Sequence, residues 1–151
     1  MLATSACSKF ESYDGPQVTR VVVVKEARTL YLLNEEGVLK TYDVDLGFAP
    51  EGDKAQEGDG RTPEGNYLID RRNPNSQYHL SLGISYPNAH DVALARAAGV
   101  EPGGDIFIHG RSWRYWTAGE DWTAGCIAVR DREIREIYAM VQDGTPIDIL
   151  P

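Results

Sequence analysis

Short apolar stretches separated by turn residues run along most of this chain. β-Branched and aromatic residues are concentrated in 18–25, 29–33 and 38–46, and residues 34–37 have the polar and glycine composition of a turn. Within 38–46 alternate positions are mainly apolar, with Lys40 as the exception, and the positions between them are mainly polar. This pattern predicts three antiparallel strands, the last of which has one face toward solvent.

The rest of the chain contains further strand-like stretches and only two helical ones. Strands are predicted at 66–70, 78–86, 106–108, 127–129 and 145–150. One helix is predicted at 91–98, an alanine-rich stretch followed by Gly99, and it is expected to pack over the sheet. The other is predicted to have Asp131 as its N-cap and to run to about Gln142, with an apolar stripe formed by Ile134, Ile137, Tyr138 and Val141.

These elements predict a mainly β fold, an antiparallel β-sandwich with two short helices. The pattern argues against a doubly wound α/β fold, because too few helices separate the strands and no glycine-rich phosphate loop follows the first strand. At 151 residues the chain has the length of one domain. Residues 16–151 are expected to form this domain, and 1–15 to be a disordered tail or the remnant of a lipoprotein signal that ends at Cys7.

Charge and hydropathy limit the partners of the chain. A formal net charge of −8, with no cluster of lysine and arginine, argues against nucleic acid. No apolar run approaches the roughly 20 residues that a membrane span needs. The acidic, glycine-containing stretch 47–61 lacks the spacing of a calcium loop and is interpreted as a solvated surface loop.

Candidate chemistry is concentrated in residues 106–130. His109 ends one apolar run, and Cys126 directly precedes another. Either residue taken singly is more often structural, but an imidazole that takes the proton of a cysteine makes it a nucleophile, so the two form a candidate catalytic pair. Gly125 permits a tight turn that aims the N–H groups of residues 125 and 126 at one point, as an oxyanion hole requires, and Gly110 leaves room beside the imidazole.

The loop 111–122 holds all three tryptophans of the chain. Its aromatic and arginine side chains suit a groove for a peptide or glycopeptide. The candidate substrate-binding residues are Arg111, Trp113, Arg114, Tyr115 and Trp116, together with Arg130 further along. Alternatively, two or more of the aromatic residues, with Trp113 and Trp122 as the first candidates, pack the loop against the sheet.

The order of these residues resembles that of a known family. His109-Gly110, followed by a loop and by the segment 123–127 (Thr-Ala-Gly-Cys-Ile), is similar to the signature of L,D-transpeptidases of the YkuD type. Segments 61–67 and 104–110 also resemble this family, and the similarity covers about residues 18–150. The segments 73–76 and 85–88 resemble a murein L,D-transpeptidase subgroup. Many members have histidine in place of Ala124 and arginine in place of Ala128, and these two differences bear on substrate binding.

The resemblance implies a cell-wall enzyme that acts on peptidoglycan stem peptides. Cys126 would attack the carbonyl of the third, L-centred residue and displace D-Ala, with His109 as the base and with Gly125, Thr123 and Gly110 around the site. An amine or water would then resolve the thioester, so L,D-transpeptidation is expected and hydrolysis of the same type of bond is the alternative. The resemblance also implies a periplasmic or cell-envelope location, Cys7 as a candidate lipid anchor, a monomer and no cofactor.

Two alternatives from other classes remain open. A zinc hydrolase would use His79, His90, His109 and Cys126 as ligands, but their spacing matches no metal-site pattern, so no metal is expected. A non-catalytic cell-wall-binding domain would hold glycan with the aromatic loop and leave Cys126 inert. Fast alkylation of Cys126 at neutral pH would distinguish a reactive thiolate from a buried structural thiol.

Overall fold

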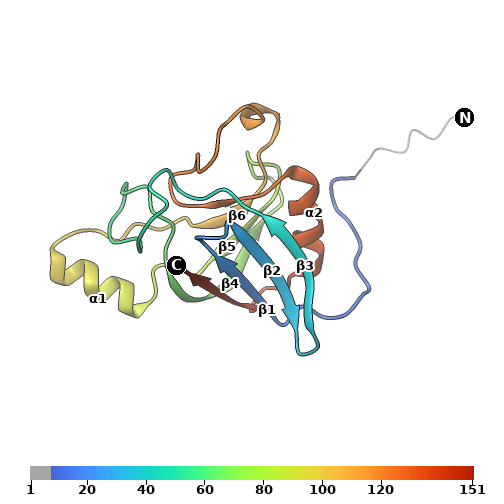
Figure 1. Ribbon diagram of the computed structural model, residues 1–151, viewed down its shortest axis with the longest axis horizontal. Coiled ribbons are helices and arrows are strands. Elements are labelled where there is room, and N and C mark those ends of the chain that lie inside the picture. The colour runs from blue at the N-terminus through green and yellow to red at the C-terminus, as the bar shows by residue number, and fades with distance from the viewer. Residues whose placement is uncertain (1–7) are drawn as a thin grey trace, which may run out of the picture.

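Eight strands form one curled sheet with the order β3-β2-β1-β8-β4-β5-β6-β7 in a computed structural model that describes residues 8–151 (Figure 1). The strands are β1 (Arg20–Val24), β2 (Thr29–Asn34), β3 (Gly37–Asp43), β4 (Gly65–Asn73), β5 (Ser81–Ile84), β6 (Phe107–His109), β7 (Ile127–Ala128) and β8 (Pro146–Leu150). The helices are α1 (Ala89–Ala98) and α2 (Asp131–Met140). The predicted class, mainly β with two short helices, is confirmed. The prediction for Cys7 concerns residues outside the described range.

The first three strands form the predicted antiparallel ribbon, in which β1 pairs with β2 and β2 with β3. Val21 and Val23 of β1 and Leu30 and Leu32 of β2 are fully buried, because alternate side chains of these strands face the core. Within 38–46, alternate side chains are buried only from Tyr42 onward. The last strand, β8, runs parallel to β1 and antiparallel to β4, and so joins the ribbon to the other half of the sheet.

The other half of the sheet carries the candidate site. β4, β5 and β6 are antiparallel neighbours, and β6 and β7 are a parallel pair. Parallel neighbours require a long connection between them, and residues 110–126 provide it. β5 is shorter than the predicted strand 78–86, since Tyr78 and His79 precede it in a turn in which His79 has a φ of 80°.

Helix α2 packs against β5 and β6 through the buried side chains of Ile134 and Ile137. The prediction that Asp131 caps this helix is wrong. Arg130 is the N-cap residue, and its backbone N–H donates to the Glu133 carboxylate at 2.9 Å. Asp131 instead accepts hydrogen bonds from the backbone N–H groups of residues 111 and 112, at 2.8 and 2.9 Å. The loop that follows His109 is thereby attached to the start of α2.

Helix α1 does not cover the sheet as expected but projects from one end of the molecule (Figure 1). Only Asp91 and Ala95 of this helix are buried. The Asn88 side chain caps its first turn, and Gly99 ends it in a left-handed conformation. Nowhere in residues 8–151 is there a helix with the length and apolar composition needed to cross a membrane.

Candidate active site

His109 and Cys126 meet because their strands are neighbours. His109 is the last residue of β6, and Cys126 immediately precedes β7, whose residues Ile127 and Ala128 pair with Ile108 and His109. Both side chains line one cavity of about 510 Å³. The segments that form the rest of its wall are the turn before β5, the residues that lead into β6, and the loop between β6 and β7.

The imidazole of His109 is held in one tautomer. Its Nδ1 lies 2.6 Å from the backbone oxygen of Gly110, and because a carbonyl oxygen can only accept, Nδ1 carries the proton and Nε2 is the basic nitrogen. The side chain is buried, with 2% of its surface exposed. Burial lowers the pKa of His109 to about 4, against a smaller opposing effect of the Gly110 hydrogen bond. His109 is therefore a neutral base at neutral pH.

Aromatic rings hold the imidazole in place. The Tyr78 ring stacks on it with a centroid distance of 4.2 Å and an interplanar angle of 19°. Trp122 presents its ring at 64° to the imidazole, 5.7 Å away, and Tyr115 stacks on Trp122 at 4.8 Å. All three aromatic residues line the cavity, so its wall beside the base is largely aromatic.

The thiol of Cys126 is also neutral at rest. It donates a hydrogen bond to the backbone oxygen of Asp105 at 3.4 Å. Burial raises the pKa of the Cys126 thiol, and a hydrogen bond from the backbone N–H of Phe107 only partly offsets this effect. The pair is therefore a neutral thiol and a neutral imidazole, not a thiolate beside an imidazolium.

The turn before Cys126 depends on Gly125 and Thr123. Gly125 has a φ of +139°, and a Cβ at this position would lie 2.8 Å from the backbone oxygen of Arg61. The hydroxyl of Thr123 accepts from the Gly125 N–H at 3.2 Å and donates to the Cys126 carbonyl at 2.7 Å. Of the two N–H groups expected to hold an oxyanion, that of Gly125 is thus already engaged.

The loop 46–64 supports this turn from behind. Thr123 and the loop are linked by backbone hydrogen bonds, from Phe48 N to Thr123 O at 2.8 Å and from Thr123 N to Leu46 O at 3.2 Å. Lys25, 2% exposed, donates from Nζ to the carbonyls of Gly52 and Thr62 at 2.7 and 2.8 Å. The loop is therefore more ordered than the solvated loop expected from its sequence.

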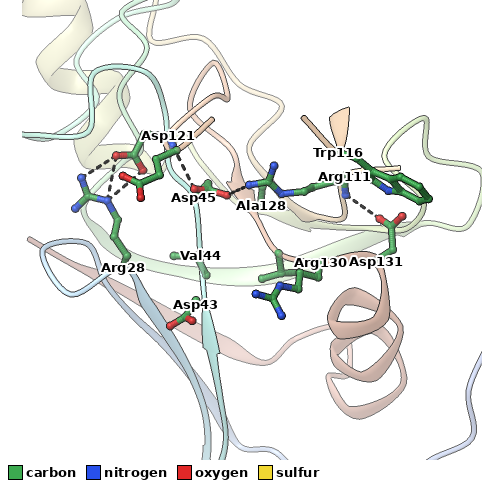
Figure 2. Close-up of a pocket in the computed structure, with 12 residues that line it drawn as sticks. Arg28, Asp43, Val44, Asp45, Arg111, Trp116, Asp121, Ala128, Arg130 and Asp131 are labelled. Carbon is green, nitrogen blue, oxygen red and sulfur yellow. Dashed lines mark hydrogen bonds and ion pairs between the residues drawn. The ribbon is translucent and has the colours of Figure 1, made fainter. Parts of the chain in front are cut away.

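Of the predicted substrate-binding residues, only Tyr115 lines the cavity. Arg111, Trp116 and Arg130 line a separate charged cleft of about 740 Å³, in which Arg111 forms an ion pair with Asp45 (Figure 2). Trp113 is 73% exposed, and the guanidinium of Arg114 lies over its ring. Of the two tryptophans expected to pack the loop, Trp122 is the one that does.

Tyr78, Trp122 and Asp105 line the cavity and were not among the predicted site residues. Tyr78 and Asp105 precede β5 and β6, and turn residues beside paired strands are the only sequence signal that indicates them. His79, a candidate neighbour of the site, does not line the cavity, and its Nε2 is buried without a hydrogen-bond partner. Within residues 8–151, no three His, Cys, Asp or Glu side chains are grouped so that they could hold a metal ion.

The comparison with known sequences agrees with this geometry. The profile of the L,D-transpeptidase catalytic domain (YkuD) matches residues 18–149. The chain belongs to this family. It is also 32% identical over 127 residues to YafK of Escherichia coli K12, a protein named as an L,D-transpeptidase. This match covers 80% of the chain and 46% of YafK.

Two solved structures share the fold of this chain. Pgp2 of Campylobacter jejuni, described as a helical cell shape determining protein, has a TM-score of 0.70 and 26% identity, over 87% of this chain and 47% of Pgp2. Bd1075 of Bdellovibrio bacteriovorus has a TM-score of 0.61 and 26% identity, over 89% of this chain and 48% of Bd1075. The chain thus spans about half the length of these relatives.

Proposed function

We propose that this L,D-transpeptidase domain is a cysteine-dependent enzyme that opens the bond between the third, L-centred residue and the following D-Ala of peptidoglycan stem peptides. The observation that supports this proposal is the placement of Cys126 and His109 at the ends of two paired strands, on one cavity, with the basic Nε2 of His109 fixed by the Gly110 carbonyl. A chain that used Cys126 only for packing would have no need of this arrangement.

The first half of the reaction is acyl transfer to sulfur. Nε2 of His109 takes the thiol proton as Sγ attacks the carbonyl carbon of the third residue, because a thiol and an imidazole that are both neutral do not ionise before attack. The tetrahedral intermediate collapses, the C–N bond breaks, and His109 returns the proton to the departing amine of D-Ala. The products are a thioester on Cys126 and free D-Ala.

The second half of the reaction determines whether the enzyme is a transferase or a hydrolase. An amine of a second stem peptide gives a cross-link, and we place this outcome first on family grounds. Water gives a shortened peptide, and one observation favours it as the alternative: Arg111, Arg114 and Arg130, which could hold the carboxylate of a second peptide, lie outside the cavity. The same chemistry would release any group joined to the third residue by an amide bond.

The proposed site of action is the periplasm or the cell envelope, where peptidoglycan is the partner. Pgp2, a helical cell shape determining protein, is similar to this chain in sequence and fold. By analogy we propose a role in cell-wall remodelling for the protein that contains this domain. Cys7 as a lipid anchor and the monomeric state remain part of this proposal.

A partition experiment tests the proposed function. The protein is incubated with a tetrapeptide donor, with and without excess acceptor amine, and the products are weighed by mass spectrometry. D-Ala release with a Cys126-linked acyl adduct is expected in the wild type and is absent in Cys126→Ala, which should remain folded by circular dichroism. A Cys126→Ala variant that still releases D-Ala contradicts the mechanism. Binding to peptidoglycan without D-Ala release would instead support a non-catalytic binding domain.

The ratio of products then separates the two reactions. A cross-linked product that increases with acceptor concentration supports transpeptidation. If only the shortened tripeptide appears at every acceptor concentration, the transferase assignment is wrong and the hydrolase alternative holds.

A further inference from the structure

One wall of the catalytic cavity is the turn between β4 and β5. The cavity is lined there by Ser76, Gln77 and Tyr78. Within residues 8–151, most hydrogen bonds of the turn backbone are local: the Asn73 and Ser76 side chains accept from the N–H groups of residues 75 and 78 at 2.9 and 3.0 Å, and the Leu80 N–H donates to the Tyr78 carbonyl at 3.2 Å. These bonds shape the turn but connect it to no other element.

The exception is Lys9, which precedes His79 by 70 positions in the chain. Its Nζ donates to the backbone oxygen of Pro74 and, at 3.2 Å, to that of His79. These acceptors are the two ends of the segment 74–79, so one ammonium group joins both ends of the cavity wall. No carboxylate of residues 8–151 forms an ion pair with Lys9 within 4.0 Å. The charge of Lys9 is thus used on these carbonyls, and such charge-assisted hydrogen bonds are stronger than neutral ones.

Residues 8–13, here called the strap, carry Lys9 along helix α2 (Figure 1). The Phe10 ring packs against Tyr138 of α2 with centroids 6.2 Å apart, and the Lys9 ammonium lies 5.6 Å from the centre of the Phe10 ring. The Glu11 carboxylate lies 3.4 Å from Nε of Arg135 on the same helix. These contacts are partly exposed, and exposed pairs are individually weak. The position of Lys9 therefore depends on the docking of the strap and not on strand pairing.

The turn that Lys9 holds is strained and contacts the base. His79 has a φ of 80°, and its buried Nε2 lacks a hydrogen-bond partner. Tyr78, the residue before it, stacks on the imidazole of His109 at 4.2 Å. Unfavourable features of this kind persist only where other contacts enforce them. One of the two carbonyls that Lys9 binds is that of His79 itself, so the ammonium acts directly beside Tyr78.

We propose that Lys9 is a positioning residue of the active site: it holds both ends of the turn 74–79 and thereby keeps the Tyr78 ring on the catalytic imidazole. This inference rests on the proposed function and adds to it a residue that lies outside the cavity and does not contact its catalytic pair. It also couples two parts of the molecule. When the strap leaves α2, the turn loses its only long-range hydrogen bonds within residues 8–151, and the base loses its fixed neighbour.

The first experiment removes the ammonium group. Lys9→Met keeps a side chain of similar length beside Phe10, and kcat/KM for D-Ala release from a tetrapeptide without acceptor should fall about tenfold, because small displacements around a base are costly. Lys9→Arg retains the charge and several donors and should stay within about threefold of the wild type. Rates are compared at pH 7.5, above the pKa of His79, which burial lowers, so that this histidine does not titrate.

The matched control is Lys40→Met. Lys40 also contacts α2, through Glu136 at 3.7 Å, but has no hydrogen bond to the turn 74–79. Its kcat/KM should equal that of the wild type. A loss as large as that of Lys9→Met would show that removal of any lysine beside α2 has this effect, and the inference would fail.

A double-mutant cycle tests whether Lys9 acts through Tyr78. Substitutions that act through the same contact are not additive. In a Tyr78→Leu protein the ring that Lys9 positions is absent, so the further change Lys9→Met should lower kcat/KM by less than about twofold. A tenfold loss in both backgrounds would show that Lys9 acts by another route and would overturn the inference.

Hydrogen exchange supplies a readout that does not require turnover. In Lys9→Met the N–H groups of Tyr78 and Leu80, which donate within the turn, should exchange about tenfold faster, while those of β1 are unchanged. Unchanged exchange, or faster exchange with an unchanged kcat/KM, overturns the inference and leaves the proposed function standing. If the wild type releases no D-Ala, the proposed function fails, and faster exchange in Lys9→Met still supports the contact between the strap and the turn.

Discussion

The ring of Tyr78 lies flat against the imidazole of His109, with centroids 4.2 Å apart and planes 19° from parallel. The next residue, His79, has a φ of 80°, and its Nε2 is buried without a hydrogen-bond partner. A positive φ and an unpaired buried nitrogen both cost free energy. Folded proteins retain such features when the surrounding structure enforces them, and they are common at functional sites. We infer that the strained turn places Tyr78 on the base, where it keeps water away from the imidazole and fixes its orientation.

Replacing Tyr78 tests this role through pH dependence. In Tyr78→Leu, water reaches His109, so the acid limb of kcat/KM should move from about pH 4 toward 6.5, and kcat should fall by about 10- to 100-fold as the imidazole loses its orientation. Tyr78→Phe keeps the stacked ring and is expected to retain kcat within about threefold. A Tyr78→Leu protein that folds, as judged by its Tm, and has an unchanged acid limb would exclude the role.

The lowered pKa of His109 predicts the pH profile of the wild type. The base must be neutral to accept the thiol proton, so activity is present above the pKa and is lost as the pH falls through about 4. The measurement is kcat/KM for D-Ala release between pH 3 and 8. An acid limb near 6.5, the ordinary value for histidine, would show that water reaches the imidazole in the free enzyme.

The same group couples stability to pH. Because the pKa of His109 is lower in the folded protein than in the unfolded chain, its contribution to stability is present above about 6.5 and is lost as the pH falls toward 4, by up to about 3 kcal/mol. Urea unfolding at pH 7.5 and pH 4.5 measures this loss. In His109→Gln the loss between the two pH values should be smaller, and an equal loss would assign the pH dependence to other groups.

Gly125→Ala should damage both the turn and the reaction. The new Cβ would lie 2.8 Å from the Arg61 carbonyl at a φ of +139°, so the backbone must shift, at a cost of about 1–3 kcal/mol. A displacement of Cys126 by about 1 Å would lower kcat by roughly 100-fold. Gly119→Ala is the control, because a Cβ at position 119 meets no atom within 4 Å. Equal kcat in the two variants would refute the proposed dependence on this turn.

Lys25→Met is expected to destabilise the loop behind the nucleophile. It leaves the carbonyls of Gly52 and Thr62 without their buried donor, at a cost of about 2–4 kcal/mol in urea unfolding. Lys40→Met is the matched control, since the Lys40 side chain is 47% exposed and its contact with Glu136 is 3.7 Å long, so a loss below about 1 kcal/mol is expected. Similar losses in both variants would show that the buried lysine has no special role.

Much of the fold could be predicted from the sequence, because alternation and turn residues are local signals. The three-stranded ribbon, the short strand before His109 and the apolar stripe of α2 were predicted to within a few residues. The parallel pairings of β1 with β8 and of β6 with β7 could not be predicted, since they join segments far apart in the chain. The role of Asp131 was predicted wrongly, because its carboxylate accepts hydrogen bonds from the backbone of residues 111 and 112 instead of capping its own helix.

The candidate site could be predicted only where its residues have local signals in the sequence. His109 and Cys126 stand next to glycines at strand ends, which is visible in the sequence. The partner of Arg111 is Asp45, 66 residues away, so nothing local indicates that the arginine is held outside the cavity. Tyr78 and Asp105 enter the site only through the turns before β5 and β6, whose shapes depend on strand pairing.

A sulfhydryl that stays protonated at rest reacts slowly with peroxide and disulfide reagents, because these attack the thiolate. As the nucleophile proposed above, Cys126 would combine two properties that usually oppose each other: attack on the substrate, and resistance to oxidation while no substrate is bound. In an oxidising medium such a thiol would stay active between encounters with its substrate without a dedicated reductant.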